Sequence, residues 1–178
     1  QVSRWSKQYV ASKTEQLDAM DELMAWLPEN LPADSEPVIV HGDYRLGNTL
    51  IHPTEPKIVA VLDWELSTLG DGLADLGYIA QDYHGDSYDE VGLAGANLGE
   101  LGIPSEEAFV DEYCRHAELA GIDNWKFYLI YNMFRSAAII QGVYKRGLDG
   151  NASSAKALEY VDAARLRSER AIELLRSL

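Results

Sequence analysis

Two short polar segments, each beside an apolar run, carry the residues best suited to chemistry. The first is "HGDYRLGN" at residues 41–48, in which Asp43 and Asn48 stand five positions apart. The second is "VLDWE" at residues 61–65, in which Asp63 ends an apolar run. A carboxylate can accept a proton, and carboxylate and amide oxygens are typical ligands of Mg²⁺. A lone aspartate in a glycine-containing loop is more often a turn residue, but the spacing and the flanking strands favour a shared site.

The apolar runs around these segments predict a β-hairpin. "NTLIH" and "KIVAVLD" have the composition of strands, and "PTEPK" between them is typical of a turn. Asn48 opens the first strand and Asp63 closes the second. An antiparallel pair therefore places these two residues side by side.

This arrangement matches the needs of phosphoryl transfer. One carboxylate orients the acceptor hydroxyl and accepts its proton, while Mg²⁺ on oxygen ligands bridges the phosphates. Protein kinases supply these groups in the pattern H-R-D-x-x-x-x-N followed by D-F-G. Here the interval from Asp43 to Asn48 is the same, and "LDW" stands where "DFG" would. Each of these two motifs alone is a weak indication of a kinase, but the two motifs in this order are fairly specific for one.

At this point the chain resembles a known family. "VIVHGDYRLGNTLIHP" and "VAVLDWELSTLGDGLADLG" are similar to the aminoglycoside phosphotransferase family of the protein-kinase-like superfamily. With "RWSKQY", they resemble more narrowly the branch associated with acyl-CoA dehydrogenases. The resemblance covers essentially the whole chain and is most specific over residues 38–78. It implies a kinase that transfers phosphate from ATP, its co-substrate, to an alcohol group of a small molecule with the help of Mg²⁺.

The resemblance also implies roles for individual residues. Asp43 matches the catalytic base, and Asn48 and Asp63 match the ligands of the Mg²⁺ that holds the nucleotide. His41 matches a loop histidine that braces the site without reacting. Asp75 resembles a buried helix aspartate that hydrogen-bonds the backbone of the catalytic loop.

Two further charged residues have a functional and a plain interpretation. Arg45, two positions after Asp43, can stabilise the oxygens of the transferred phosphate, although an exposed salt bridge is nearly as common at such a position. Glu65 follows Asp63 by two positions and shares its face in a strand. Glu65 could therefore be a metal or supporting carboxylate, with a surface role as the equal alternative.

Composition limits the partners. The chain has 178 residues and a net charge of −14, which argues against nucleic acid and anionic membranes as partners. No apolar run approaches the ~20 residues of a membrane-spanning helix. Cys114 is the single cysteine, so an internal disulfide is excluded and a small core residue in a reducing, cytoplasmic location is expected.

Periodicity predicts a mostly helical α+β protein. The family resemblance implies more narrowly a kinase-like C-terminal lobe whose short β-hairpin carries the catalytic loop and metal ligands. Helices are expected over residues 3–27, 70–83, 88–98, 105–120, 123–146 and 153–178, with Asp71 and Ser105 as N-caps. Residues 1–178 are expected to be one domain. A glycine-rich phosphate loop and its strand lysine are missing. We therefore expect the N-terminal, nucleotide-covering lobe to lie outside these residues and the isolated chain to be inactive.

Two alternatives of other classes remain open. The chain could be a pseudokinase-like binding module that forms a homodimer through an exposed apolar lobe surface. It could also be a metal-dependent phosphohydrolase that uses Asp43 and Asp63. For the kinase interpretation, the resemblance to the branch associated with acyl-CoA dehydrogenases implies a hydroxyacyl compound or its CoA thioester as acceptor, in preference to an aminoglycoside.

Overall fold

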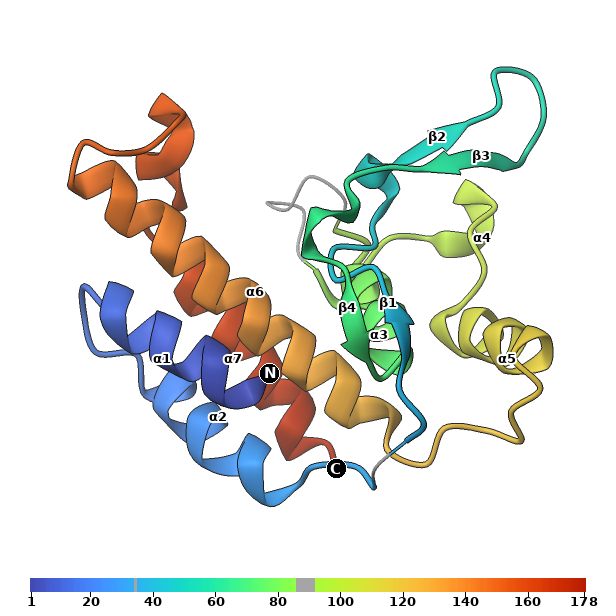
Figure 1. Cartoon of the computed structure of the whole chain (residues 1–178), viewed down its shortest axis with the longest axis horizontal. Helices are drawn as coiled ribbons and strands as arrows, with labels where there is room; N and C mark the ends of the chain where they lie inside the picture. The colour runs from blue at the N-terminus through green and yellow to red at the C-terminus, as the bar shows by residue number, and fades with distance from the viewer. Residues whose placement is uncertain (34, 86–91) are drawn as a thin grey trace. The chain divides into compact units, whose positions relative to one another are not determined.

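The computed structural model describes residues 1–33, 35–85 and 92–178, which form two compact units (Figure 1). Unit 1 consists of Gln1–Pro32 together with Leu129–Leu178. Unit 2 consists of Ala33–Tyr128. The long helix α6, Trp125–Leu148, begins in unit 2 and continues in unit 1.

Unit 1 is a helical bundle. Its helices are α1 (Val2–Ser12), α2 (Asp18–Glu29), most of α6, and α7 (Ala163–Arg176). Each contributes a buried stripe at helical spacing, such as Met20, Leu23 and Leu27 on α2. A fully buried side chain of this kind stabilises the fold by about 1.5–3 kcal/mol. The apolar periodicity of the sequence thus predicts the core of this unit well.

The predicted single helix over residues 3–27 is wrong, because the structure divides it into α1 and α2. The backbone leaves the helix at Lys13, where ψ is 124°. The side chain of Gln141 on α6 donates hydrogen bonds to the Ser12 carbonyl at 3.0 Å and to Thr14 Oγ1 at 2.9 Å. A carbonyl at the end of a helix lacks an intrahelical partner, and α6 supplies one here, so tertiary contact ends the helix.

The predicted helix over residues 153–178 is also divided. A 3₁₀ segment covers Ala155–Tyr160, and α7 begins only at Ala163. The segment approaches α6 closely at Gly147, where an added Cβ would lie 3.0 Å from the Cβ of Ala157. We attribute the tighter 3₁₀ turn to this close packing.

Unit 2 holds two small antiparallel sheets. Strand β2 (Thr49–Ile51) pairs with β3 (Ile58–Val61), which confirms the predicted hairpin. Strand β1 (Val38–Val40) pairs with β4 (Thr68–Gly70) in the register Val38↔Gly70. The three-residue β4 was not predicted, since only its pairing with β1 makes it a strand.

The helices of unit 2 partly match the sequence prediction. Helix α3 (Leu73–Ala80) continues as a 3₁₀ turn over Gln81–His84. Helix α5 (Glu106–His116) begins after Ser105, whose Oγ accepts the Ala108 N–H as predicted. The helix ends at His116 rather than near residue 120. Residues 88–91 of the predicted helix 88–98 lie outside the described residues, and 92–97 are not helical; a short α4 follows at Leu98–Leu101.

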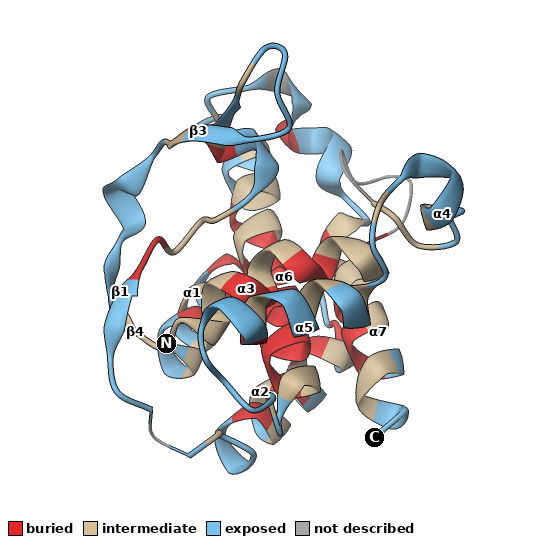
Figure 2. Cartoon of the chain, turned by 90° about the vertical axis from the view of Figure 1, so that its right-hand side faces the viewer, coloured by how far each residue is buried: buried red, intermediate tan, exposed pale blue. Residues whose placement is uncertain are grey.

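The fold is mostly helical α+β, as predicted. Cys114 is buried in α5, in agreement with its expected core position. Among the described residues, no helix is long and apolar enough to cross a membrane. Figure 2 shows most of the β-strand residues of unit 2 exposed, in contrast to the buried faces of the helices.

Candidate functional site

His41 lies at the centre of the polar loop that follows β1. The residue is buried, with 3% of its surface exposed. Its Nδ1 accepts the Asp43 backbone N–H at 3.2 Å, and its Nε2 lies 2.7 Å from the Leu62 carbonyl oxygen. Because Nδ1 accepts, Nε2 carries the proton and donates to Leu62. The imidazole therefore ties the loop to the end of β3.

Asp75, in the first turn of α3, holds the same loop from the other side. Its carboxylate accepts the backbone N–H of His41 at 2.5 Å and that of Gly42 at 2.9 Å. Hydrogen bonds to an ionised acceptor are about twice as strong as neutral ones. Gly42 adopts φ +83°, and an added Cβ would lie 2.6 Å from the Leu66 carbonyl oxygen. Only glycine fits this turn without strain.

Asn48 closes the loop by holding Asp43. It ends the 3₁₀ turn Leu46–Asn48 and is 6% exposed. Its Nδ2 donates to both the backbone oxygen and Oδ2 of Asp43, each at 2.8 Å. The amide nitrogen is thus engaged, and Oδ1 is the atom of Asn48 left for another ligand.

Asp63 is the second residue after β3, the strand that pairs with the segment following Asn48. Thr49 pairs with Val61 at this end of the hairpin. Beyond this pair, the Leu62 N–H donates a hydrogen bond of 2.8 Å to the Asn48 carbonyl. Asp63 therefore follows Leu62 at the end of the hairpin, as the strand pattern predicts. Its backbone is left-handed, with φ 64° and ψ 55°, and its side chain is exposed. Non-glycine residues in this conformation are uncommon and concentrate at functional sites.

Arg45 and Glu65 lie at the margin of this cluster. Arg45 Nε is 3.6 Å from Oδ2 of Asp43, and about half of its side chain is exposed. Glu65 is exposed on the 3₁₀ turn Trp64–Leu66, which begins directly after the left-handed Asp63. The expected strand geometry that would place Glu65 on the face of Asp63 is therefore wrong. Across the part of the chain that the structure describes, no three His, Cys, Asp or Glu side chains gather as a metal-binding group. An asparagine–aspartate pair is a different kind of site, because it includes an amide oxygen.

The sequence did not predict two contacts that support the site. The indole ring of Trp64 packs on His41, with ring centroids 4.7 Å apart. The Tyr128 hydroxyl donates to Asp71 Oδ2 at 2.6 Å, while Asp71 Oδ1 accepts the Leu73 N–H that begins α3. The N-cap position itself is Gly72, one residue after the predicted Asp71. These contacts join residues that are separated by 23 and by 57 positions in the sequence, and no periodic signal predicts such contacts.

The charges of this region also affect its tyrosines. Burial, together with Asp71 and Asp75, raises the pKa of Tyr113 above its usual value. Burial and the hydrogen bond to Asp71 raise the pKa of Tyr128. Both phenols therefore stay neutral at physiological pH, and Tyr128 can serve as a hydrogen-bond donor.

Comparison with known proteins assigns the family. The profile of the phosphotransferase enzyme family, APH, matches residues 1–128, which include every residue of the candidate site. The chain belongs to the APH phosphotransferase family. The resemblance inferred from the "HGDYRLGN" and "LDW" motifs is thereby confirmed.

The curated relatives of this family member are longer proteins, and the chain matches only a part of each. Acyl-CoA dehydrogenase family member 10 of Mus musculus is 46% identical over 159 residues, which are 88% of this chain and 15% of the relative. Acyl-CoA dehydrogenase family member 11 of Homo sapiens is 40% identical over 176 residues, which are 98% of this chain and 23% of the relative. The chain thus spans less than a quarter of the length of these two relatives.

A solved structure agrees with the fold. A Ralstonia eutropha protein, described provisionally as an aminoglycoside phosphotransferase, is 45% identical and superimposes with a TM-score of 0.92. The match covers 99% of this chain and 54% of that protein. The fold of this phosphotransferase family member is therefore kinase-like, as predicted.

Proposed function

We propose that this chain carries the catalytic loop of an ATP-dependent phosphotransferase that acts on a hydroxyl group of a small molecule. The observation that carries the proposal is the Asn48–Asp43 contact, in which one amide nitrogen holds both the backbone and the carboxylate of Asp43. A turn aspartate without a catalytic task does not need a buried asparagine to orient its carboxylate.

Asp43 is the proposed base. With Oδ2 engaged by Asn48 and near Arg45, Oδ1 is the oxygen that can accept the proton of the acceptor hydroxyl. A fixed carboxylate rotamer favours this transfer, because the reacting atoms are already oriented. Arg45 is proposed to interact with the oxygens of the transferred phosphate.

Asn48 Oδ1 and the Asp63 carboxylate are the proposed ligands of Mg²⁺. They fit the ion, because both are hard oxygen donors and neither atom is used in the hydrogen bonds that hold the loop. Glu65 is a further candidate, as ligand or as a supporting carboxylate. When bound, Mg²⁺ would hold the phosphates of ATP and balance their charge. His41 and Asp75 take no part in the chemistry and keep the loop in shape.

The proposed acceptor is a hydroxyacyl compound or its CoA thioester. This choice is supported by the relatives named as acyl-CoA dehydrogenase family members. An aminoglycoside is the competing acceptor. Comparing ADP release with hydroxyacyl-CoA and with an aminoglycoside, each given to the full-length protein, distinguishes the two.

We also propose that residues 1–178 form one lobe of the enzyme and that the nucleotide-covering lobe lies outside them. The chain has no glycine-rich loop followed by a strand lysine, which kinases use to cover the phosphates. The isolated chain should therefore turn over poorly. Brisk ATP-dependent turnover by residues 1–178 alone would contradict this part of the proposal.

The decisive experiment replaces Asp43 by asparagine in the full-length protein. This change keeps the size of the side chain and removes the proton acceptor, so turnover should fall by about 10²–10⁴-fold. Circular dichroism and thermal unfolding should remain close to those of the unchanged protein. Near-normal turnover in this variant would show that Asp43 is not the base.

A non-catalytic binding module is the second candidate, and exposed apolar side chains favour it. Ile39 and Leu69 face each other across β1 and β4 and are 73% and 69% exposed. Such a surface favours association, including homodimer formation. Mg²⁺-dependent nucleotide binding supports the kinase, whereas a dimer with no nucleotide affinity supports the module. Phosphate release without an acceptor would instead indicate the phosphohydrolase.

A further inference from the structure

A small pocket in unit 1 has a charge opposite to that of the rest of the chain. It lies between α6 and the 3₁₀ segment Ala155–Tyr160 and has a volume of about 210 Å³. Its polar lining comes from Arg146, Ser153, Ser154, Lys156 and Tyr160. Among the described side chains that line it, two are cationic and none is acidic, although the chain as a whole carries −14.

The two cations of the pocket differ from neighbouring cationic side chains in their ion pairing. Lys145, next to Arg146 on α6, forms an ion pair with Asp149 at 2.5 Å. Arg165, early in α7, forms ion pairs with Asp162 and Glu169. Within the described residues, the heads of Arg146 and Lys156 have no such acidic partner. In a chain with about twice as many acids as bases, two cations without acidic partners beside one pocket point to an external anion.

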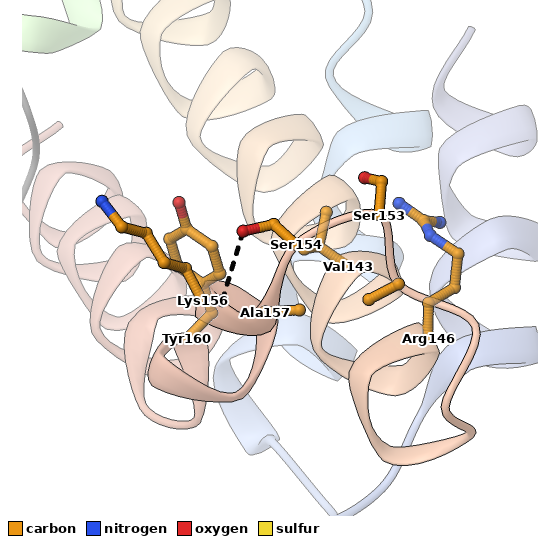
Figure 3. A pocket seen from close by; sticks show the side chains of 8 residues that line it. Val143, Arg146, Ser153, Ser154, Lys156, Ala157 and Tyr160 are labelled. Atoms are coloured by element: carbon orange, nitrogen blue, oxygen red, sulfur yellow. Dashed lines mark hydrogen bonds between the residues drawn. The ribbon is translucent and has the colours of Figure 1, made fainter.

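Hydroxyl groups complete the lining. Figure 3 shows the tips of Arg146, Ser153, Ser154, Lys156 and Tyr160 directed toward the same side, with Arg146 and Lys156 at opposite ends. The Oγ of Ser154 accepts the Lys156 backbone N–H at 3.2 Å, so its own hydrogen remains available to donate. These groups offer several hydrogen-bond donors between two positive ends.

We propose that this pocket binds the diphosphate group of an organic ligand. A single phosphate would engage one end, whereas a diphosphate carries charge along its length and can approach both cations. The pocket is smaller than the ~300–1,000 Å³ of sites that enclose a whole drug-sized ligand, so the organic part extends into solvent. Nucleoside diphosphates and coenzyme A share this chemistry.

The test is calorimetric titration of the protein with inorganic pyrophosphate, in EDTA to suppress metal-dependent binding elsewhere. Binding should weaken about tenfold, or by about 1.4 kcal/mol, in the double variant Arg146→Gln/Lys156→Gln, since charge-assisted contacts are lost. Lys145→Gln is the matched control, because it removes one positive charge from the same end of α6 without altering the pocket lining. It should leave binding nearly unchanged.

Three outcomes would overturn the proposal. The unchanged protein could fail to bind pyrophosphate at millimolar concentration. Lys145→Gln could weaken binding as much as the double variant, which would indicate general electrostatics. Asp63→Asn could abolish binding while the double variant retains it, which would place the ligand at the catalytic loop. Titration with ADP and with coenzyme A then identifies the source, since the tighter ligand should show the same loss in the double variant.

Discussion

His41 and Leu62, 21 residues apart, are joined by a hydrogen bond of 2.7 Å from the imidazole Nε2 to a backbone carbonyl. Leu62 is also the residue that donates its N–H to the Asn48 carbonyl. One backbone unit thus connects the loop that holds Asp43 to the hairpin that ends at Asp63. The relative position of the proposed base and the proposed metal ligand depends on this connection.

Replacement of His41 by alanine should lower the free energy of unfolding by about 2–3 kcal/mol, because it leaves the Leu62 carbonyl and the Asp43 N–H without partners. Urea titration measures the effect. His116→Ala is the control, since His116 is an exposed histidine paired with Glu112; this change should cost less than about 0.5 kcal/mol. Equal losses in the two variants would show that the His41 contacts do not stabilise the loop.

The turn at Gly42 offers a test that separates strain from steric overlap. Gly42→Ala meets both a positive φ and the Leu66 carbonyl at 2.6 Å, whereas Gly102→Ala meets a positive φ of +68° with open space around it. Left-handed backbone alone costs an alanine about 1–2 kcal/mol. Thermal unfolding should show a clearly larger loss for Gly42→Ala. If the two losses are the same, the loop has room for a Cβ and its shape is not as constrained as the structure indicates.

Two buried tyrosines should respond in opposite ways to loss of their hydroxyl. Tyr9 is fully buried, and its hydroxyl has no hydrogen-bond partner among the described residues, whereas Tyr128 donates to Asp71. Tyr9→Phe should leave stability unchanged or raise it by at most about 1 kcal/mol, while Tyr128→Phe should lower it by about 1–2 kcal/mol. Chemical denaturation of both variants measures the difference. A larger loss for Tyr9→Phe would mean that its hydroxyl has an unseen partner, such as water.

The raised pKa of Tyr9 also predicts that the protein loses stability at alkaline pH. Burial, then the nearby charges of Asp21 and Glu15, raise its pKa from 10.0 to about 12. The folded state keeps the proton longer than the unfolded state, so this group's contribution is full below pH 10 and is lost as pH rises toward 12. Between pH 10 and pH 12, the free energy of unfolding should therefore fall less steeply with pH in Tyr9→Phe than in the unchanged protein. An unchanged slope would show that Tyr9 titrates normally.

The lowered pKa of Glu106 predicts that the protein loses stability at acidic pH. Burial raises its pKa, but hydrogen bonds from His84 and Trp125, at 2.7 and 2.6 Å, outweigh this and leave the pKa below its usual 4.5. A lowered pKa stabilises the folded state above the unfolded pKa, and the contribution disappears as pH falls through the folded value. The stability difference between the unchanged protein and Glu106→Gln should therefore shrink below pH 4.5. A difference that is constant from pH 7 to pH 3 would contradict the assignment.

The sequence predicted the elements whose residues interact locally. The apolar runs "NTLIH" and "KIVAVLD", with "PTEPK" between them, were enough to predict the hairpin, because strand pattern and turn composition agree. The end of α1 could not be predicted, since it depends on Gln141, 129 residues from Ser12. The short strand β4 and the packing of Trp64 on His41 likewise arise only when distant segments meet. Long-range contacts override local propensity at these positions.

Asp63 allows function to be separated from stability. Its left-handed backbone is unfavourable for a residue with a side chain, so Asp63→Gly should raise the free energy of unfolding slightly, by up to about 0.5 kcal/mol, since aspartate tolerates this conformation better than most residues. The same change removes a proposed Mg²⁺ ligand and should reduce Mg²⁺-dependent nucleotide binding at least tenfold in the full-length protein.

Glu118 supplies the matched control, because it is the other described non-glycine residue with positive φ, at 55°, and it is exposed after α5. Glu118→Gly should stabilise the chain by about 0.5–1 kcal/mol and leave nucleotide binding unchanged. Calorimetric titration with Mg²⁺ and ADP, paired with urea unfolding, measures both quantities for both variants. Retained nucleotide affinity in Asp63→Gly would remove Asp63 from the proposed metal site, whereas a loss of stability would show that its carboxylate makes a contact that outweighs the strain.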